Sequence, residues 1–459
     1  MSEKIRKMVE EYKLSKLGGF SEDTYCPLPW SSITIDPTGN FKICCFSGAQ
    51  FGITDDSRSA DHGLAYDSNN QPLNILTHTI KEALNSKDHK ELRLAQSKNK
   101  RHPTCEVCWT RDDAAKASKT PSLALRGNRA SQSRLWDDPS ILIENVSKKM
   151  KSDGSLHEDD LGPVSLDLRL SNLCNMKCLM CDSKYSSLWV EDDIALGKMQ
   201  VRHGMKFYDI VSKSNNKPIV DSVPWHDSPK FWKEIDDLSP RLRHIYLTGG
   251  EPFLVPSHDE LLDRLISGGY ASNITLEYDT NLSVIRPKTL NKLKLFKDVI
   301  LAVSSDDVED RYELIRFPGR WNTLFENISK IKESGIPIAR ITTCIAPYNV
   351  YAPMRLRKTF PNDKLNTRIL RAPMFLNIKR FGPKAKKQIL NEYEKHDTTV
   401  REYSLVSGYL KNVIDTPYNE IELLEFVDYM DKLDVIRGTD WKSVTPETVE
   451  LFALDGLKL

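Results

Sequence analysis

The feature that most constrains the fold is a repeated alternation of short β-rich runs with amphipathic helical stretches from residue 164 onward. Runs of this kind occupy residues 164–171, 243–250, 273–280, 298–305 and 339–346, and a sixth is expected near 372–378. Repeated strand–helix units imply parallel strands joined by right-handed crossovers. Six units are too few for a closed eight-fold barrel, so the sequence predicts an α/β fold with a partial, open (β/α)6 barrel.

The segments on either side of this barrel have a different texture. The stretch SSITIDPTGNFKICCF, residues 31–46, reads as two alternating strands joined by a turn, which indicates a small α+β domain. Beyond residue 385, helical patterns dominate. The expected limits are a helical segment at 1–25, the small domain at 26–130, a charge-rich linker at 131–163, the barrel at 164–385 and a helical region at 386–459.

The composition is that of an ordinary globular chain. Its 65 lysine and arginine residues nearly balance its 64 aspartate and glutamate residues, so net charge gives no reason to expect a nucleic-acid or membrane partner. The longest apolar run, VILAV at 299–303, is too short to span a bilayer. Nine cysteines without a secretory signal favour a reducing cytoplasm, where clustered thiols are usually metal ligands or catalytic groups.

Three cysteines follow the first predicted barrel strand with the spacing C-x-x-x-C-x-x-C. They are Cys174, Cys178 and Cys181. In parallel α/β folds, ligands bind at the carboxyl ends of the strands, so the position suits a functional site. Three thiolates suit a 4Fe–4S cluster with one iron left open, whereas a tetrahedral zinc site lacks its fourth ligand here. The alternative is a zinc site completed by a distant cysteine or histidine.

This triplet resembles the signature of the radical S-adenosylmethionine (SAM) superfamily. The resemblance implies that the open iron chelates SAM, that SAM is cleaved reductively, and that the resulting 5′-deoxyadenosyl radical removes a hydrogen atom from a substrate. It also implies an external electron donor such as flavodoxin or ferredoxin. One departure is Met180, where most members carry an aromatic residue against adenine, although a thioether can make a similar apolar contact.

Further stretches resemble the SAM-contacting motifs of this family. The resemblance assigns cofactor contacts to Gly249, Gly250, Glu251 and Pro252 in YLTGGEP, Asn281 after YDT, Ser304 in VSSDD, Arg316 in YELIRF, and Asn349 after the fifth strand. It gives Asp306 a supporting role. Each position also has a simpler alternative, because Ser304 could cap a helix and Arg316 could form a surface ion pair.

Four cysteines upstream of the barrel form a second pattern. They are Cys26, Cys44, Cys105 and Cys108, with Gly39 placed between the first two. The spacing Cys-x12-Gly-x4-Cys resembles the start of the SPASM and twitch auxiliary-cluster modules, which usually follow the barrel and here precede it. The resemblance implies one auxiliary 4Fe–4S cluster, and a four-cysteine zinc site is the alternative. Cys45 adjoins Cys44 on an expected strand, where neighbours point to opposite faces, and the glycine spacing favours Cys44.

Three other features allow two interpretations each. Cys344 in the fifth strand is most simply a small buried hydrophobe, although a thiol in the barrel could also donate a hydrogen atom to a product radical. The insertion at about 190–227, with Trp189, Trp225 and His226, either packs on the barrel or forms a lid. The basic stretch 368–387 is a solvated face, or it attracts an acidic peptide or a phosphorylated substrate.

Together these patterns predict a radical SAM enzyme that oxidatively modifies a peptide or protein side chain. Alternative substrates are a sugar, a nucleotide or another small metabolite. A competing class is a non-catalytic binding protein that holds zinc or a cluster without cleaving SAM. The intact triplet and the GGEP stretch favour the enzyme.

Overall fold

The structure is a computed structural model. It describes residues 24, 26–45, 47, 63–117, 150–157, 164–198, 200–203, 206–209, 224–370, 373–397, 399–416, 420–457 and 459. Nearly all of the predicted N-terminal helical segment, most of the predicted linker at 131–163 and part of the 190–227 insertion lie outside the described residues.

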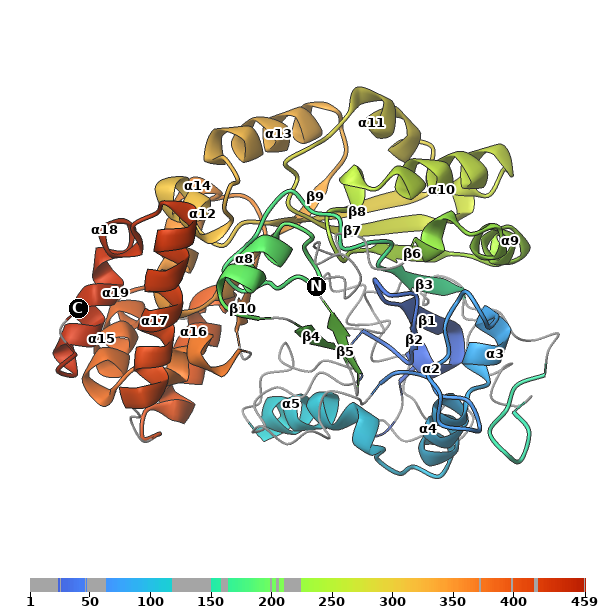
Figure 1. Ribbon diagram of the computed structural model, residues 1–459, viewed down its shortest axis with the longest axis horizontal. Coiled ribbons are helices and arrows are strands. Elements are labelled where there is room, and N and C mark those ends of the chain that lie inside the picture. The colour runs from blue at the N-terminus through green and yellow to red at the C-terminus, as the bar shows by residue number, and fades with distance from the viewer. Residues whose placement is uncertain are drawn as a thin grey trace.

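An eight-stranded sheet forms the centre of the molecule (Figure 1). Six of its strands run parallel to their neighbours, in the order β10-β9-β8-β7-β6-β3. These strands are β3 (Ser165–Leu168), β6 (His244–Leu247), β7 (Thr275–Thr280), β8 (Asp298–Ser304), β9 (Ile338–Ile345) and β10 (Leu365–Ile369). Helices connect them on one face, which confirms the predicted open α/β barrel.

The sixth barrel strand lies earlier in the chain than the sequence predicts. Strand β10 pairs with β9 over Leu365–Ile369, whereas the described residues 373–378 contain no strand but a short 3-10 turn, Met374–Leu376, and the start of another, Ile378–Arg380. The expected position is therefore wrong. Thr367 interrupts the apolar positions of β10, which leaves only Leu365 and Ile369 to mark this short strand in the sequence.

The N-terminal hairpin is an extension of the barrel sheet. Strand β1 (Ser32–Ile35) pairs in parallel with β3, and β2 (Phe41–Lys42) pairs antiparallel with β1. The turn between β1 and β2 needs glycine at position 39, because Gly39 has a φ of +81° and an added Cβ would lie 3.0 Å from the ring of Trp225. The predicted hairpin is thus present, but its first strand belongs to the same sheet as the barrel.

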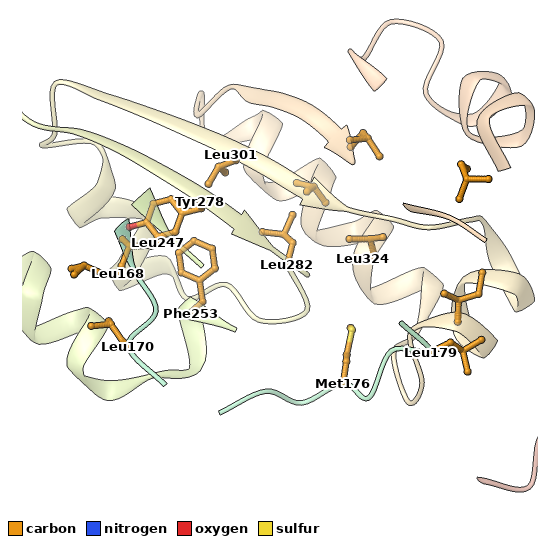
Figure 2. Close-up of a cluster of buried hydrophobic side chains, with 14 of the residues drawn as sticks. Leu168, Leu170, Met176, Leu179, Leu247, Phe253, Tyr278, Leu282, Leu301 and Leu324 are labelled. Atoms are coloured by element: carbon orange, nitrogen blue, oxygen red, sulfur yellow. The ribbon is translucent and has the colours of Figure 1, made fainter. Parts of the chain in front are cut away.

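The core lies between the sheet and the helices that cover its outer face. Apolar residues that alternate along the strands, including Leu168, Leu247 and Leu301, are buried there, and the rings of Phe253 and Tyr278 stack at 5.0 Å (Figure 2). The covering helices are α9 (Pro229–Leu238), α10 (Pro256–Ser267), α11 (Pro287–Leu293), α12 (Glu309–Ile315), α13 (Trp321–Glu333) and α14 (Ala352–Thr359). The intervening strand residues face the opposite side of the sheet.

Smaller elements surround this barrel. The N-terminal part adds α2 (Leu28–Ser31), α3 (Ile80–Leu84), α4 (Lys87–Ser97) and α5 (Glu106–Ala117), and the insertion adds α8 (Trp189–Ala195), β4 (Gln200–His203) and β5 (Lys206–Asp209). Trp189 and Trp225 are fully buried, so these two aromatic side chains pack inward. In the part of the chain that the structure describes, no helix is both long and apolar enough to cross a membrane.

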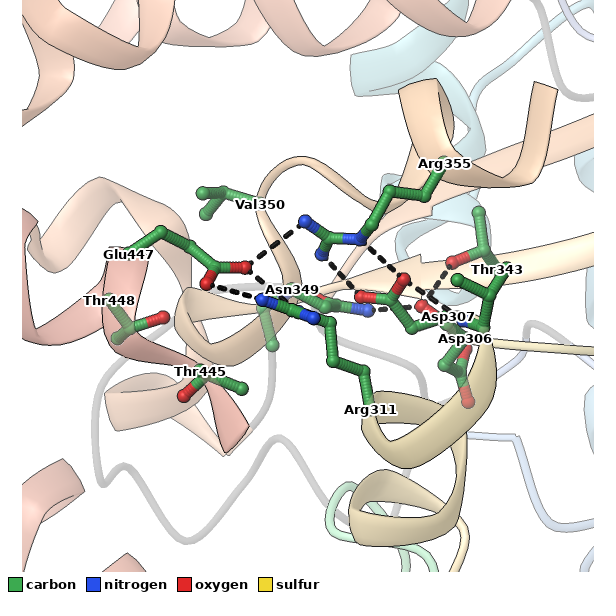
Figure 3. A network of polar contacts seen from close by, with 12 residues as sticks. Asp306, Asp307, Arg311, Thr343, Asn349, Val350, Arg355, Thr445, Glu447 and Thr448 are labelled. Carbon is green, nitrogen blue, oxygen red and sulfur yellow. Dashed lines mark hydrogen bonds and ion pairs between the residues drawn. The ribbon is translucent and has the colours of Figure 1, made fainter. Parts of the chain in front are cut away.

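The C-terminal helices pack on the barrel through a buried polar network. They are α15 (Pro383–Glu394), α16 (Arg401–Val413), α17 (Glu420–Arg437), α18 (Trp441–Val444) and α19 (Pro446–Leu454). Glu447 on α19 accepts hydrogen bonds from Arg311 at 2.8 Å and from Arg355 at 3.1 Å (Figure 3). Arg355 also donates to Asp307 at 2.7 Å, directly after β8. This network joins the last helix to the strand ends of the barrel.

Candidate active site

A cavity of about 1220 Å³ is lined by residues within and just beyond the barrel strands. Ten residues that the sequence predicts to ligate the SAM-binding cluster or to contact SAM line it: Cys174, Cys178, Met180, Cys181, Gly249, Gly250, Glu251, Asn281, Ser304 and Arg316. Strand ends and the loops after them therefore bring together positions as far apart in sequence as 174 and 316, as expected for a parallel barrel.

Two predicted contact residues do not line this cavity. Pro252 is buried as the first residue of a short 3-10 turn, Pro252–Leu254. Asn349 is fully buried and donates hydrogen bonds to the backbone oxygens of Asp306 at 2.7 Å and Cys344 at 3.0 Å. In this structure Asn349 ties the ends of β8 and β9 together.

The cysteine-bearing loop is held by backbone contacts with the end of α12. The amide of Lys177 donates to the carbonyl of Phe317, and the amide of Leu179 donates to that of Ile315 at 2.9 Å. On the other side, the indole of Trp189 donates to the carbonyl of Cys178 at 2.9 Å. The loop therefore has a defined position although it contains no helix or strand.

The two glycines of GGEP allow this loop to pack closely. An added Cβ on Gly250 would lie 2.3 Å from the carbonyl oxygen of Leu173, closer than any real contact. Gly249 has a φ of +114°, which other residues rarely adopt. The amides of Gly250 and Glu251 donate to the carbonyls of Ser171 and Leu173. The glycines are thus required by contact with the cysteine loop, whatever their contact with a cofactor.

Glu251 joins two strand ends. Its buried carboxylate accepts hydrogen bonds from the Thr280 hydroxyl and from the Asn281 amide, both at 2.7 Å. Burial raises the pKa of Glu251 to about 7, against the opposing effect of these hydrogen bonds. The contacts fix Asn281, whose side-chain amide lies 3.8 Å from the sulfur of Cys174.

Arg316 is a buried residue and not part of a surface ion pair. Its guanidinium lies 2.7 Å from the carboxylate of Asp306, and the two side chains are 12% and 0% exposed. The other terminal nitrogen of Arg316 lies 3.8 Å from the sulfur of Cys178. Ser304 does not cap α12, because the residue at that position is Val308.

The donor set fits an iron–sulfur cluster held through three thiolates. Burial raises the pKa of Cys174 to about 12 and also raises the pKa of Cys178 and Cys181, so a cationic metal centre is needed to hold these groups as thiolates. Asn281 and Arg316 direct N–H groups at two of the sulfurs, the kind of interaction that tunes cluster ligands. Among the described residues, no group of three or more His, Cys, Asp or Glu side chains could hold a single metal ion.

The upstream cysteines are divided between two places. Cys44 and Cys45 both line the cavity, whereas Cys26, Cys105 and Cys108 are not part of its wall. Neighbouring residues on a strand point to opposite faces, but this does not distinguish Cys44 from Cys45, because β2 ends at Lys42. Cys44 begins a turn in which its carbonyl accepts a hydrogen bond from the hydroxyl of Ser47. Cys105 and Cys108 flank the start of α5. None of the nine cysteines forms a disulfide.

Sequence reasoning did not place in the cavity a second group of residues, on the strands or just beyond them, although it singled out Arg368 within the basic stretch 368–387. They are Asp167, Arg169, His244, Tyr246, Glu277, Asp279, Arg340 and Arg368. Most of them alternate with buried apolar residues, as in Ser-Leu-Asp-Leu-Arg of β3 and the residue after it. This alternation could have revealed these residues from the sequence, because the side chains between the apolar ones must face the inside of the barrel.

Comparison with known families agrees with this architecture. Residues 168–350 match the family model of the radical SAM superfamily, and residues 26–109 match that of SPASM, an iron–sulfur cluster-binding domain. The chain thus carries a radical SAM domain preceded by a cluster-binding domain. These two domain types together imply SAM and 4Fe–4S clusters, one of them auxiliary, as cofactors. No curated protein sequence matches the chain significantly.

Solved structures with a detectable likeness include "Native anSMEcpe with bound AdoMet", at 16% identity and a TM-score of 0.34, covering 50% of this chain and 59% of that chain. Another is Streptococcus suis SuiB bound to S-adenosylmethionine, at 14% identity and a TM-score of 0.33, covering 69% of this chain and 62% of that chain. The match thus spans about three-fifths of the length of each of these proteins.

Proposed function

We propose that the protein is a radical SAM enzyme that oxidatively modifies a peptide or protein side chain. The observation that carries this proposal is that the Cys174, Cys178 and Cys181 triplet, the Gly-Gly loop and two upstream cysteines line one cavity. When bound, SAM and the cluster would supply a 5′-deoxyadenosyl radical that can remove a hydrogen atom. The protein supplies position and shields the reacting atoms from water.

The residues of the cavity around the triplet have proposed roles. The three triplet cysteines hold the SAM-binding cluster, and Asn281 and Arg316 keep two of these sulfurs in place by N–H contacts. Asp306 orients Arg316. Met180, Gly249, Gly250 and Ser304 form the part of the wall proposed to face SAM.

The upstream cysteines are proposed to hold the auxiliary cluster. Cys26, Cys105, Cys108 and one of the adjacent pair Cys44 and Cys45 form the ligand set, in a domain of residues 26–130 that precedes a core of residues 164–385. Since the adjacent pair lines the same cavity as the triplet, the second cluster would lie beside the substrate space, where it can exchange an electron. A flavodoxin or ferredoxin is the proposed external donor.

The cavity has room for a substrate as well as SAM. Its volume is about 1220 Å³ before SAM and the cluster are placed in it, and Pro373, Phe375 and residues of α17 form part of its wall. Typical small-molecule pockets measure about 300–1,000 Å³. A peptide segment would enter through the part of the cavity that SAM and the cluster leave free.

The test is SAM cleavage by the full-length chain, reconstituted with iron and sulfide without air and reduced with dithionite. We expect 5′-deoxyadenosine from the wild type and at least a hundredfold less from Cys178→Ala, while Cys344→Ala, a matched loss of a barrel thiol outside the cavity wall, retains cleavage. Failure of a fully iron-loaded wild type to form deoxyadenosine would favour a binding protein. For the peptide, mass spectrometry should detect a loss of hydrogen in a short peptide encoded beside the gene, and an unchanged mass would count against that substrate.

A further inference from the structure

The interior of this open barrel is polar, in contrast to the interior of a closed eight-fold barrel. Closed barrels are generally filled by branched apolar side chains. Here the inward positions of β3, β6, β7, β9 and β10 carry Asp167, Tyr246, Asp279, Arg340 and Arg368, all on the cavity wall. A polar interior of this size is suited to a polar ligand.

Most of the interior charges are paired with one another. Arg340 on β9 lies 2.8 Å from Glu277 and 3.5 Å from Asp279, both on β7. It reaches across β8 at Ala302, which is the register partner of both Asp279 and Arg340 and has a side chain too small to block the way. The phenol of Tyr246 donates to the other oxygen of Asp279 at 2.5 Å.

A second pair of opposite charges, Arg169 and Asp167, lies at β3. Arg169, just after β3, lies 3.6 Å from Asp167 and donates to the hydroxyl of Tyr185 at 3.3 Å. The other oxygen of Asp167 accepts from Thr34 of β1 at 3.2 Å. Both Arg169 and Arg340 are therefore already neutralised by carboxylates.

Arg368 differs from these two arginines. Its side chain is exposed to the cavity, and in the described part of the chain no hydrogen-bond or ion-pair partner is found for it. It lies on β10 in register with Cys344 of β9. Burial raises the pKa of both Tyr246 and Cys344, and the positive charge of Arg368 acts to lower both. The charge of Arg368 therefore acts on the Tyr246–Asp279 pair.

The chemistry of a free guanidinium in a cavity narrows the choice of ligand. Arginine binds a carboxylate through two parallel N–H···O bonds. A phosphate dianion is disfavoured, because it would bring two negative charges beside the carboxylates of Glu277 and Asp279, and Arg368 supplies one positive charge against them. A neutral sugar would leave the guanidinium without a counter-charge.

We propose that Arg368 binds a carboxylate of the substrate inside the barrel, so that the substrate is a peptide segment that carries a carboxylate. That the carboxylate belongs to the substrate depends on the proposed function. The Tyr246–Asp279 pair, on the wall of the same cavity, offers hydrogen-bond partners for the peptide groups next to the acid.

The test uses phenylglyoxal, which modifies accessible arginines, on the full-length chain, with the rate at each arginine followed by mass spectrometry. The probes are N-acetylalanine, its neutral amide and inorganic phosphate. We expect N-acetylalanine to slow the modification of Arg368 at least fivefold and the amide to have no effect. Arg320, exposed and paired with Glu313 at 2.8 Å outside the cavity wall, is the internal control and should react at one rate throughout.

Calorimetric titration provides a second measurement. N-acetylalanine should bind at least tenfold more weakly to Arg368→Met than to the wild type, and to Arg320→Met with unchanged affinity. Equal protection by acid and amide, or stronger protection by phosphate than by the acid, would overturn the assignment. A wild type that forms deoxyadenosine without protection of Arg368 overturns this inference alone, and one that binds the acid without cleaving SAM overturns the proposed function alone.

Discussion

Arg437 at the end of α17 lies 2.7 Å from Asp192 of α8, and both side chains are only 1% exposed. The other oxygen of Asp192 contacts Lys177 in the cysteine loop at 2.5 Å. Tyr429, two turns earlier on α17, donates to the carbonyl of Leu179 in the same loop at 2.7 Å. Helix α17 thus braces the loop that carries the triplet, although this helix lies outside both matched domains.

Replacing Arg437 with methionine should destabilise the protein substantially. Removal of one partner from a buried ion pair typically costs about 3–5 kcal/mol, and Lys177 keeps part of the charge of Asp192 compensated, so about 3 kcal/mol is expected. Urea unfolding measures this change. The matched control is Lys233→Met, which removes an exposed partner of Asp237 and should leave the unfolding midpoint unchanged. Equal effects of the two substitutions would show that α17 does not brace the loop.

Gly250→Ala should displace the cysteine loop, because the new methyl group would overlap the carbonyl of Leu173. We expect overpacking to lower the free energy of unfolding by roughly 1–3 kcal/mol. We also expect incomplete loading of the triplet with iron. The control is Gly408→Ala in α16, where an added Cβ meets nothing within 4 Å, so stability should rise slightly. Full iron content in Gly250→Ala would contradict the role given to this glycine.

Iron content should identify the auxiliary ligand of the adjacent cysteine pair. Two 4Fe–4S clusters correspond to about eight iron atoms per chain. If Cys44 is the ligand, Cys44→Ala should fall to about four iron atoms after anaerobic reconstitution, and Cys45→Ala should keep about eight. The reverse pattern would assign the role to Cys45, and about four iron atoms in the wild type would argue against an auxiliary cluster.

Glu277 should make stability depend on acid pH. Burial alone raises its pKa, but the contacts with His244 and Arg340 outweigh this effect and lower the pKa from 4.5 to about 2. Because the folded pKa lies below the unfolded one, the stabilisation is present above about pH 4.5 and is lost as the pH falls toward about 2. The difference in unfolding free energy between wild type and Glu277→Gln should therefore shrink over this interval.

Urea unfolding at pH 6, 4.5 and 3, values that bracket the fall described by linkage, checks this expectation. The same substitution in an Arg340→Met background should show a weaker trend, because a cation that lowers the pKa of Glu277 is absent. A difference that stays constant from pH 6 to pH 3 would show that these contacts do not act on the carboxylate as described.

The sequence predicted the barrel and the strand ends that meet at the cavity because these depend on local patterns. Apolar periodicity revealed five of the six barrel strands, and β10 was misplaced because Thr367 leaves it with only two apolar residues, Leu365 and Ile369. The cysteine spacing and the Gly-Gly pair were visible because each is a short motif in the sequence, whereas the contact of Gly250 with Leu173 was not.

The contacts that sequence reasoning could not reveal join distant parts of the chain. The Arg437–Asp192 pair spans 245 residues, and nothing local to either residue indicates the other. The parallel pairing of β1 with β3 is likewise invisible, because each strand alone fits either a separate hairpin or a barrel edge. The ligand roles of the predicted site residues stay predictions.

The ladder between β1 and β3 limits how this protein can be dissected. A fragment that begins after the hairpin would expose the backbone N–H and C=O groups of β3 along its whole length, and such bare edges promote self-association. Excising the amino-terminal portion, or grafting it onto another catalytic scaffold, therefore requires a replacement strand and not merely a new linker.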